Sequence, residues 1–418
     1  MNKVIAAFFL LSISIHVTGQ IKNTTIAGLA GAPVRASIAI NPKDIQLSTA
    51  AAGNIVYYST NGGETWQKSA AVFKEGSNAV LVSDSKGNLY YLLQATEGGV
   101  NRIWCYTSDD GGQQWDGGNA INAESTKDQV NPNVSLTDKN DLYVTYTQFD
   151  KFGNADPNCL STIQLTKSSN GKKWDKSMEL SQTPGNCIDD RNTAIGPMAI
   201  ESPDGKEYCI WSNQSKIFMD RSFDGRQWLT NDIAIARQSE SCDEEVAGSK
   251  RCFTPPVFVV DRNKNGSRGT LYITWSDLLQ HDTDVWFLRS HNYGDNWSSL
   301  LKVNEDIPDV HQYNPWMTID HATGYIYILY FARNGDEDTD VYLAHSVDGG
   351  SNFKNIKISE TPFKSNNNAG VSGYITVNKG VIVAAWTRWD NGKASLLTAT
   401  VKQEELVPVN SAKPVGKK

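Results

Sequence analysis

The sequence predicts an all-β fold: a single β-propeller of seven blades, with six blades as the alternative. Three observations predict it. A short turn phrase recurs six times, pairs of apolar-alternating strands recur seven times, and strand-like segments stand at both ends of the repeated region. Internal repeats with a period of about 50 residues are typical of propellers. We therefore expect one domain at 20–401, a signal peptide at 1–19 and a flexible tail at 402–418.

The turn phrase is typical of a tight hairpin. An Asp or Asn side chain accepts hydrogen bonds from N–H groups of its own turn, glycine permits positive φ, and a final aromatic ring packs between strands. Because turn chemistry explains every position, we expect these residues to build the scaffold rather than a site. The eight-residue copies are 59–66, 108–115, 290–297 and 346–353, and the seven-residue copies are 168–174 and 222–228.

A pair of period-two strands recurs with the turn phrases. The last unit has a third strand, Ser395–Val401, but no fourth. Asn23–Gly31, ahead of the first unit, can supply the missing outer strand, and such a closed ring has no exposed sheet edges. The first strand of each pair occupies 37–41, 79–83, 133–137, 198–201, 257–260, 317–320 and 374–377.

The N-terminus is typical of an export signal. Lys3 precedes an apolar run at 4–15, which is too short to span a bilayer, and small residues at 17–19 precede Gln20. No cysteine lies near this point, which argues against a lipid anchor. We expect a secreted or periplasmic monomer without a membrane span.

Charge excludes one class of partner. The 418 residues contain 39 Lys+Arg and 46 Asp+Glu, a net charge of −7. Nucleic-acid binding requires clustered positive charge, so we expect no nucleic-acid partner.

The cysteines predict two local disulfides in an oxidising compartment. Cys159 with Cys187, and Cys242 with Cys252, stand in loop-like segments, whereas Cys105 and Cys209 stand in strands and are expected to be buried thiols. There is no C-x-x-C spacing for zinc. The segment 261–266 resembles the opening of a calcium loop but lacks its acidic closing residue, so we expect no metal and no cofactor.

The turn phrase resembles the Asp-box, or BNR repeat, of the sialidase-like β-propellers. Residues 270–353 especially resemble secreted bacterial BNR-repeat proteins that are loosely labelled glycosyl hydrolases or exo-sialidases, through 271–277, 282–286 and 311–317. The resemblance implies a propeller with a carbohydrate-related function. Sialidases carry Arg-Ile-Pro on their first strand. Here Arg35 stands one place later, and a shift of one residue turns a strand side chain to the opposite face.

Candidate site residues are expected at the axial mouth, on the face opposite the turn phrases. His311 and Tyr313 are a candidate proton-transfer pair, and Asp277 is a candidate carboxylate acid or base. The candidate substrate-binding residues are anion-clamping arginines, an aromatic sugar platform and an amide. They are Arg191, Arg251, Arg333, Arg388, Trp389 and Asn314. The alternative for all of them is a structural role in loop hydrogen bonds, packing and surface ion pairs.

Together these features predict a glycosidase that acts on an acidic glycan. Two alternatives stay open: a polysaccharide lyase on the same scaffold, and a non-catalytic propeller that binds glycan or protein.

Overall fold

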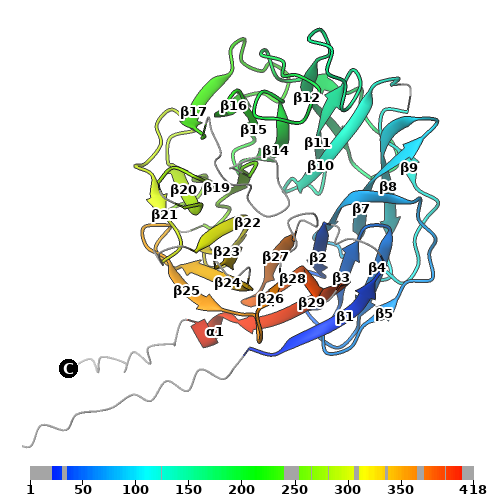
Figure 1. Cartoon of the computed structure of the whole chain (residues 1–418), viewed down its shortest axis with the longest axis vertical. Coiled ribbons are helices and arrows are strands. Elements are labelled where there is room, and N and C mark those ends of the chain that lie inside the picture. Colours follow the sequence, from blue (N-terminus) through cyan, green and yellow to red (C-terminus); the bar gives the residue numbers. More distant parts are fainter. Residues whose placement is uncertain are drawn as a thin grey trace, which may run out of the picture.

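The computed structural model describes residues 21–30, 35–123, 125–239, 254–264, 266–280, 282–305, 310–334, 338–364, 371–390 and 392–406. Within these residues, seven antiparallel sheets form a ring around a central axis (Figure 1). The fold is all-β, with one short helix in the described part of the chain. The predicted seven-bladed propeller is confirmed.

Each blade runs from an inner strand at the axis to an outer strand at the rim. Blade 1 has β2 (Ala36–Ile40), β3 (Ser48–Ala52), β4 (Ile55–Ser59) and β5 (Gln67–Lys68). Blade 2 has β6 (Gly76–Ser83), β7 (Leu89–Glu97), β8 (Val100–Ser108) and β9 (Asn119–Ala120). Blade 3 has β10 (Asp128–Leu136), β11 (Leu142–Phe149), β12 (Ser161–Ser168) and β13 (Met178–Glu179). Blade 4 has β14 (Ile195–Glu201), β15 (Glu207–Asn213), β16 (Lys216–Ser222) and β17 (Ile233–Arg237). Blade 5 has β18 (Val257–Val260), β19 (Leu271–Asp277), β20 (Asp284–Ser290) and β21 (Leu301–Lys302). Blade 6 has β22 (His311–Asp320), β23 (Tyr325–Arg333), β24 (Asp338–Ser346) and β25 (Lys354–Lys357), and β26 (Phe363–Lys364) also pairs with β24. Blade 7 has β27 (Gly373–Asn378), β28 (Val381–Asp390) and β29 (Lys393–Lys402), with β1 (Asn23–Leu29) as its outer strand.

The core lies between neighbouring blades. Second strands such as β15 and β19 are buried along their whole length, whereas the outer strands β5 and β13 are exposed. A sheet covered on both faces needs apolar residues on both, which explains the near-continuous apolar runs of the second strands. Trp211, Trp275 and Trp386 occupy equivalent second-strand positions and are almost completely buried.

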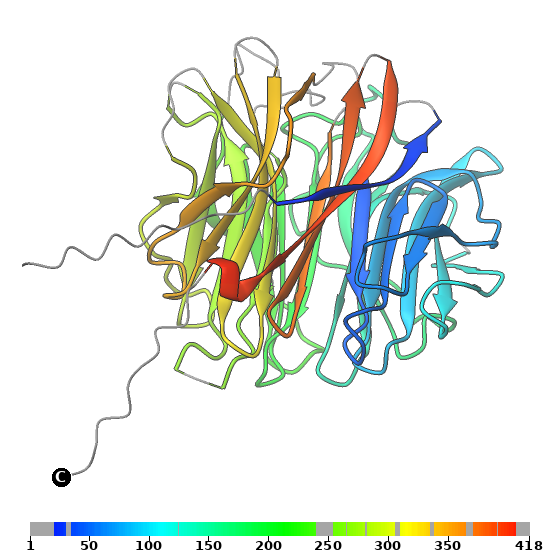
Figure 2. The same cartoon turned by 90° about the horizontal axis from the view of Figure 1, so that it is seen from below.

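The ring is closed by strands from both ends of the chain. β1 pairs antiparallel with β29, from Asn23 opposite Ala399 to Leu29 opposite Ala394. The two strands lie side by side along the rim in both views (Figures 1 and 2). The predicted closure is therefore confirmed, and the covered edge cannot template pairing with another chain.

The chain stays attached to the propeller beyond the expected boundary at Lys402. β29 includes Lys402, and α1 (Gln403–Leu406) follows it directly. Gln403 Oε1 accepts a hydrogen bond of 3.0 Å from the hydroxyl of Tyr327 in blade 6. These contacts hold residues 402–406 on the propeller, and the rest of the tail expected at 402–418 lies outside the described residues.

The turn phrases join the third and fourth strands and make the predicted hydrogen bonds. In blade 6, Asp348 Oδ1 accepts from the N–H groups of Ser351 and Asn352 at 3.0 Å each, and Ser346 Oγ accepts from Gly350 N at 2.9 Å. Blade 2 repeats the pattern around Asp110. The phrases therefore serve the scaffold, as expected.

The Cys159–Cys187 disulfide is present, with Cα atoms 5.7 Å apart. It joins the β11–β12 loop to the β13–β14 loop. Cys105 and Cys209 are buried free thiols, as predicted. The predicted Cys242–Cys252 bridge and signal peptide lie outside the described residues. None of the described helical segments is long and apolar enough to cross a membrane.

Candidate functional site

A cavity of about 370 Å³ opens at the axis, on the face where the inner strands begin. Neighbouring strands of a blade are antiparallel, so successive turns alternate between the two faces of the ring. The turn that joins the first and second strands therefore lies at the other face, together with the turn phrase that joins the third and fourth strands. All seven blades contribute to the cavity. One lining residue from each blade, in chain order, is Arg35, Asn78, Asn131, Gly196, Val257, Asn314 and Gly373.

Four inner strands carry the same irregularity where they enter the cavity. Asn78, Asn131, Gly196 and Asn314 have positive φ angles of 52°, 56°, 65° and 51°, and the strand register shifts at each of them. Asn and Gly tolerate this left-handed conformation better than other residues. The resulting β-bulges re-aim the chain toward the axis.

Sequence reasoning missed this pattern, although a signal exists. Asn131, Gly196 and Asn314 are each followed by proline, within the inner strands β10, β14 and β22. Proline cannot donate to a strand ladder and is found at bulges. An Asn/Gly-Pro pair at the same place in three repeats therefore marks the cavity wall.

Arg35 is the one cation among the described residues that line this cavity. Its Nη1 donates to the carbonyl of Pro132 at 3.1 Å and its Nη2 to Asn133 Oδ1 at 2.8 Å, both in blade 3. The guanidinium carbon lies 5.0 Å from the ring centroid of Trp316 in blade 6. Arg35 thus reaches across the axis, from blade 1 to blades 3 and 6. It precedes β2 rather than lying within it, so its one-residue shift from the Arg-Ile-Pro position does not set the direction of its side chain.

The partners of Arg35 within the described residues are uncharged. Burial lowers the pKa of Arg35 from its usual value to about 10, and the neighbouring Tyr374 hydroxyl acts weakly in the opposite direction. Burying a charge without a counter-charge is costly. An anion in the cavity would offset this cost.

Asparagine side chains share the lining of the cavity with Arg35. Asn78 Nδ2 donates to Gln94 Oε1 at 2.9 Å, and Asn314 Nδ2 donates to the Val371 carbonyl at 2.8 Å. Asn131 donates only through its backbone N–H, to Gln94 Oε1 at 3.1 Å, in the part of the chain described here. The N–H donors and the oxygen of its side-chain amide therefore make no hydrogen bond to the described residues.

Among the predicted site residues, Asn314 lines the cavity. His311 and Arg333 face each other across β22 and β23 at the same end of blade 6, and His311 Nδ1 accepts from Thr283 N at 3.3 Å. Neither belongs to the described lining of the cavity. The structure therefore brings this pair together, but outside the described lining of the cavity.

Two predicted catalytic side chains are enclosed by protein. Tyr313 has no exposed surface and stacks on Phe331, with centroids 5.8 Å apart. Asp277 is also fully buried; its carboxylate accepts from the hydroxyl of Ser239 at 2.6 Å, and burial raises its pKa. The structure thus places both in the packing between strands, and the predicted His311–Tyr313 pair does not face the cavity.

The other predicted binding residues are dispersed. Arg388 forms an ion pair with Asp390 and donates to Thr361 Oγ1 at 2.8 Å, in a small pocket beside β1. Trp389, also in β28, is partly buried opposite Ala394. Arg191 is exposed in the β13–β14 loop, and Arg251 lies outside the described residues. Because Arg388 is held at the closure seam, it does not clamp a ligand at the axis.

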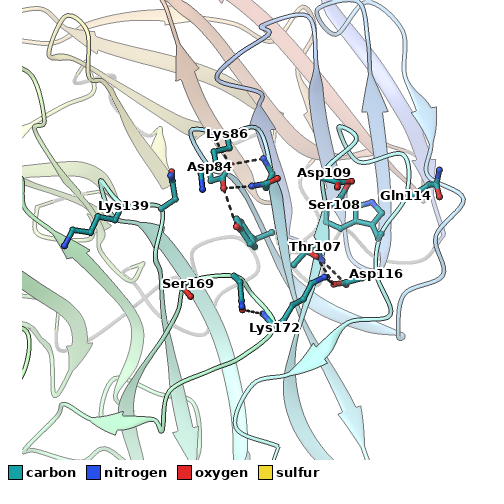
Figure 3. A pocket seen from close by; sticks show the side chains of 15 residues that line it. Asp84, Lys86, Thr107, Ser108, Asp109, Gln114, Asp116, Lys139, Ser169 and Lys172 are labelled. Atoms are coloured by element: carbon teal, nitrogen blue, oxygen red, sulfur yellow. Dashed lines mark hydrogen bonds and ion pairs between the residues drawn. The ribbon is translucent and has the colours of Figure 1, made fainter.

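A second cavity, of about 450 Å³, lies between blades 2 and 3 on the turn-phrase face (Figure 3). Asp84 accepts from Lys86 N and Asn88 N at 2.9 and 2.8 Å, and Asp116 accepts from Thr107 Oγ1 at 2.7 Å. The carboxylates of Asp84 and Asp116 are therefore engaged in holding their own turns.

No protein-family model and no curated protein sequence matches the chain. Solved structures do match it. An ulvan lyase, from a new family of polysaccharide lyases, is similar with a TM-score of 0.53 and 12% identity, over 91% of this chain and 96% of that one. An α-L-arabinofuranosidase from Fusarium graminearum matches with a TM-score of 0.49 and 12% identity, over 93% and 99% of the two chains. A Hadza microbial sialidase matches with a TM-score of 0.47 and 12% identity, over 87% and 75%. At 12% identity, the property shared with the ulvan lyase is the propeller fold.

Proposed function

We propose that the protein is a carbohydrate-active propeller that holds an anionic glycan in the axial cavity. The observation that carries the proposal is the Arg35 guanidinium, which is partly buried at the axis among uncharged partners. An arginine has five N–H donors. Within the described residues two are used, by Pro132 and Asn133, which leaves three for a ligand.

A carboxylate or sulfate group suits these donors. Arginine binds such groups through two parallel hydrogen bonds, and the attraction is stronger where protein replaces water. The Asn78 and Asn314 amide oxygens can accept hydrogen bonds from sugar hydroxyls, and Asn131 can both donate and accept. Met198 and Trp316 supply apolar wall, so the cavity combines a few polar groups with apolar surface as ligand sites do.

Glycoside hydrolysis is the reaction class favoured by the Asp-box resemblance, with elimination by a lyase or binding without cleavage as alternatives. The ulvan lyase that shares this fold has been solved bound to -[GlcA(1-4)Rha3S]-, which carries both a uronate and a sulfate. Its ligand supports sulfated and uronate-containing polysaccharides as the first substrates to test.

The test compares the parent protein with Arg35→Met against ulvan, alginate, polygalacturonate, sialyllactose and neutral arabinan. Isothermal titration calorimetry measures binding. We expect the parent to bind at least one anionic glycan, and Arg35→Met to bind it at least tenfold more weakly, because a buried charge contact contributes about 2–5 kcal/mol. Arg388→Met is the matched control, since this arginine lies at the closure seam, and it should bind like the parent. Equal binding by Arg35→Met and the parent, or no binding of any anionic glycan, contradicts the proposal.

Product analysis separates the three reaction classes. Hydrolysis adds water across the glycosidic bond and produces a new saturated reducing end. Elimination leaves an unsaturated uronate, which absorbs in the ultraviolet. Binding without either product identifies a non-catalytic glycan-binding propeller.

A further inference from the structure

Two aromatic rings are exposed on the face opposite the axial cavity. Phe223 is 54% exposed and Tyr293 is 44% exposed, in the turn phrases of blades 4 and 5. Neither ring contributes to the cores between the blades. We call these two rings the aromatic platform.

Tyr293 holds its ring there in a strained backbone conformation. Its φ angle is 64°. The three other eight-residue turn phrases have glycine at this position, Gly62, Gly111 and Gly349, with φ angles of 71°, 77° and 67°. A bulky residue in the left-handed region is an outlier, and such strain concentrates at functional sites. Turn formation alone favours glycine, so the turn does not account for Tyr293.

Charged side chains connect the two rings. Lys206 Nζ lies 4.1 Å from the ring centroid of Tyr293 and 6.0 Å from that of Phe223. The guanidinium carbon of Arg221 lies 5.1 Å from the Phe223 centroid, and Arg221 Nη1 donates to the Tyr293 carbonyl at 2.7 Å. These contacts orient both rings from blade 4, so the platform spans two blades.

The cations of the platform are already neutralised. Arg221 pairs with Asp295 at 2.7 Å, and Lys206 pairs with Asp204. A polyanion such as a nucleic acid binds through unpaired cations, so this platform does not suit one. Exposed rings beside paired donors and acceptors suit a ligand that has apolar C–H faces, hydroxyl groups and no charge.

We propose that Phe223 and Tyr293 form a second binding site, which takes a neutral saccharide. A sugar ring stacks on the open parts of the aromatic rings, and the carboxylates of Asp204 and Asp295 accept its hydroxyl hydrogens. The site lies on the face opposite Arg35 and does not depend on the axial cavity. On a polymeric glycan, two sites on one molecule raise the overall affinity through effective concentration.

The test uses native affinity electrophoresis of the full chain in gels that contain xylan, galactomannan or laminarin. The variants are Tyr293→Gly, Phe223→Ala and Tyr293→Phe, and Arg35→Met reports on the axial cavity. We expect at least one of these neutral polysaccharides to retard the parent, Tyr293→Phe and Arg35→Met. Tyr293→Gly and Phe223→Ala should migrate as they do in a gel without polysaccharide.

A thermal melt separates binding from folding. Because glycine relieves the strain, Tyr293→Gly should melt about 1–3 °C above the parent even though it loses retardation. Failure of all three polysaccharides to retard the parent, or equal retardation of Tyr293→Gly and the parent, overturns the proposal. A melting temperature of Tyr293→Gly below that of the parent also overturns it, because Tyr293 would then stabilise the turn. Retardation that is lost in Arg35→Met alone assigns the neutral saccharide to the axial cavity and likewise overturns the second site.

Discussion

The guanidinium of Arg35 stacks on the indole ring of Trp316, 5.0 Å from its centroid, although the two residues stand in blades 1 and 6. Trp316 packs in turn on Tyr374 of blade 7, with centroids 4.4 Å apart. The hydrogen bonds of Arg35 to blade 3 complete the arrangement. One cation of blade 1 is thus positioned by residues of blades 3 and 6, and blade 7 supports the indole ring.

Replacing Trp316 tests this positioning. Trp316→Leu should weaken the binding of the anionic glycan identified with the parent by about 5- to 30-fold, because a desolvated cation–π contact contributes about 1–2 kcal/mol. Trp316→Phe retains an aromatic face and should lose less affinity. Calorimetric titration of the two variants checks the order, and an unchanged dissociation constant for Trp316→Leu would rule out the positioning role.

Asn131 allows backbone strain and ligand contact to be separated. Its φ is 56°, and its side-chain amide faces the cavity region without a hydrogen bond to described residues. Asn131→Gly permits the same φ and should fold with nearly the parent's stability. Asn131→Ala should be less stable by about 1 kcal/mol, because alanine is strained there. Both variants lack the amide and should bind the anionic glycan several-fold more weakly. Retained affinity in the glycine variant would show that this amide makes no ligand contact.

The Cys159–Cys187 disulfide encloses a loop with a sequence separation of 28. Replacing both cysteines with serine should lower the free energy of unfolding by about 3–4 kcal/mol, since the unfolded chain regains conformational freedom. Urea unfolding measures this change. Cys105→Ala is the control, because it removes a buried free thiol without breaking a cross-link. Dithiothreitol should destabilise the parent more than the double variant, and any effect left in the double variant would report the predicted Cys242–Cys252 bridge.

Asp220 should make stability depend on pH. It is fully buried in β16, and burial raises its pKa to about 7, against the opposing hydrogen bonds from Arg221 N and Leu229 N. An unfolded aspartate titrates near 3.9, so between about pH 4 and 7 the folded state binds the extra proton. This contribution to the free energy of unfolding therefore falls as the pH rises, by about 1.4 kcal/mol per unit within that window.

The variant Asp220→Asn isolates this contribution. Asparagine keeps an oxygen for the two backbone N–H groups and has no charge to desolvate. Urea unfolding at pH 5 and pH 8 should show that the parent loses stability relative to the variant as the pH rises. Parallel pH dependence of the two proteins would contradict the shifted pKa.

The axial site was only partly predictable. From the sequence we expected a site at the axial mouth and named Asn314, which lines the cavity, but also Tyr313 and Asp277, which lie in the packing between strands. A shift of one residue reverses the direction of a strand side chain, and the bulges at Asn78, Asn131 and Asn314 change that register. Side-chain direction near a bulge is therefore not set by residue spacing.

The sequence by itself determined the propeller, its seven blades, its closure by Asn23–Leu29 and the Cys159–Cys187 bridge. These features follow from turn chemistry within eight contiguous residues, from strand periodicity and from a count of repeats. Only the tertiary structure decided that Arg35 meets Trp316 and Asn133, and that Lys206 lies between Phe223 and Tyr293. Those contacts join different blades or turns that are far apart in the chain, so they depend on the tilt and register of the blades, which no local pattern of residues encodes.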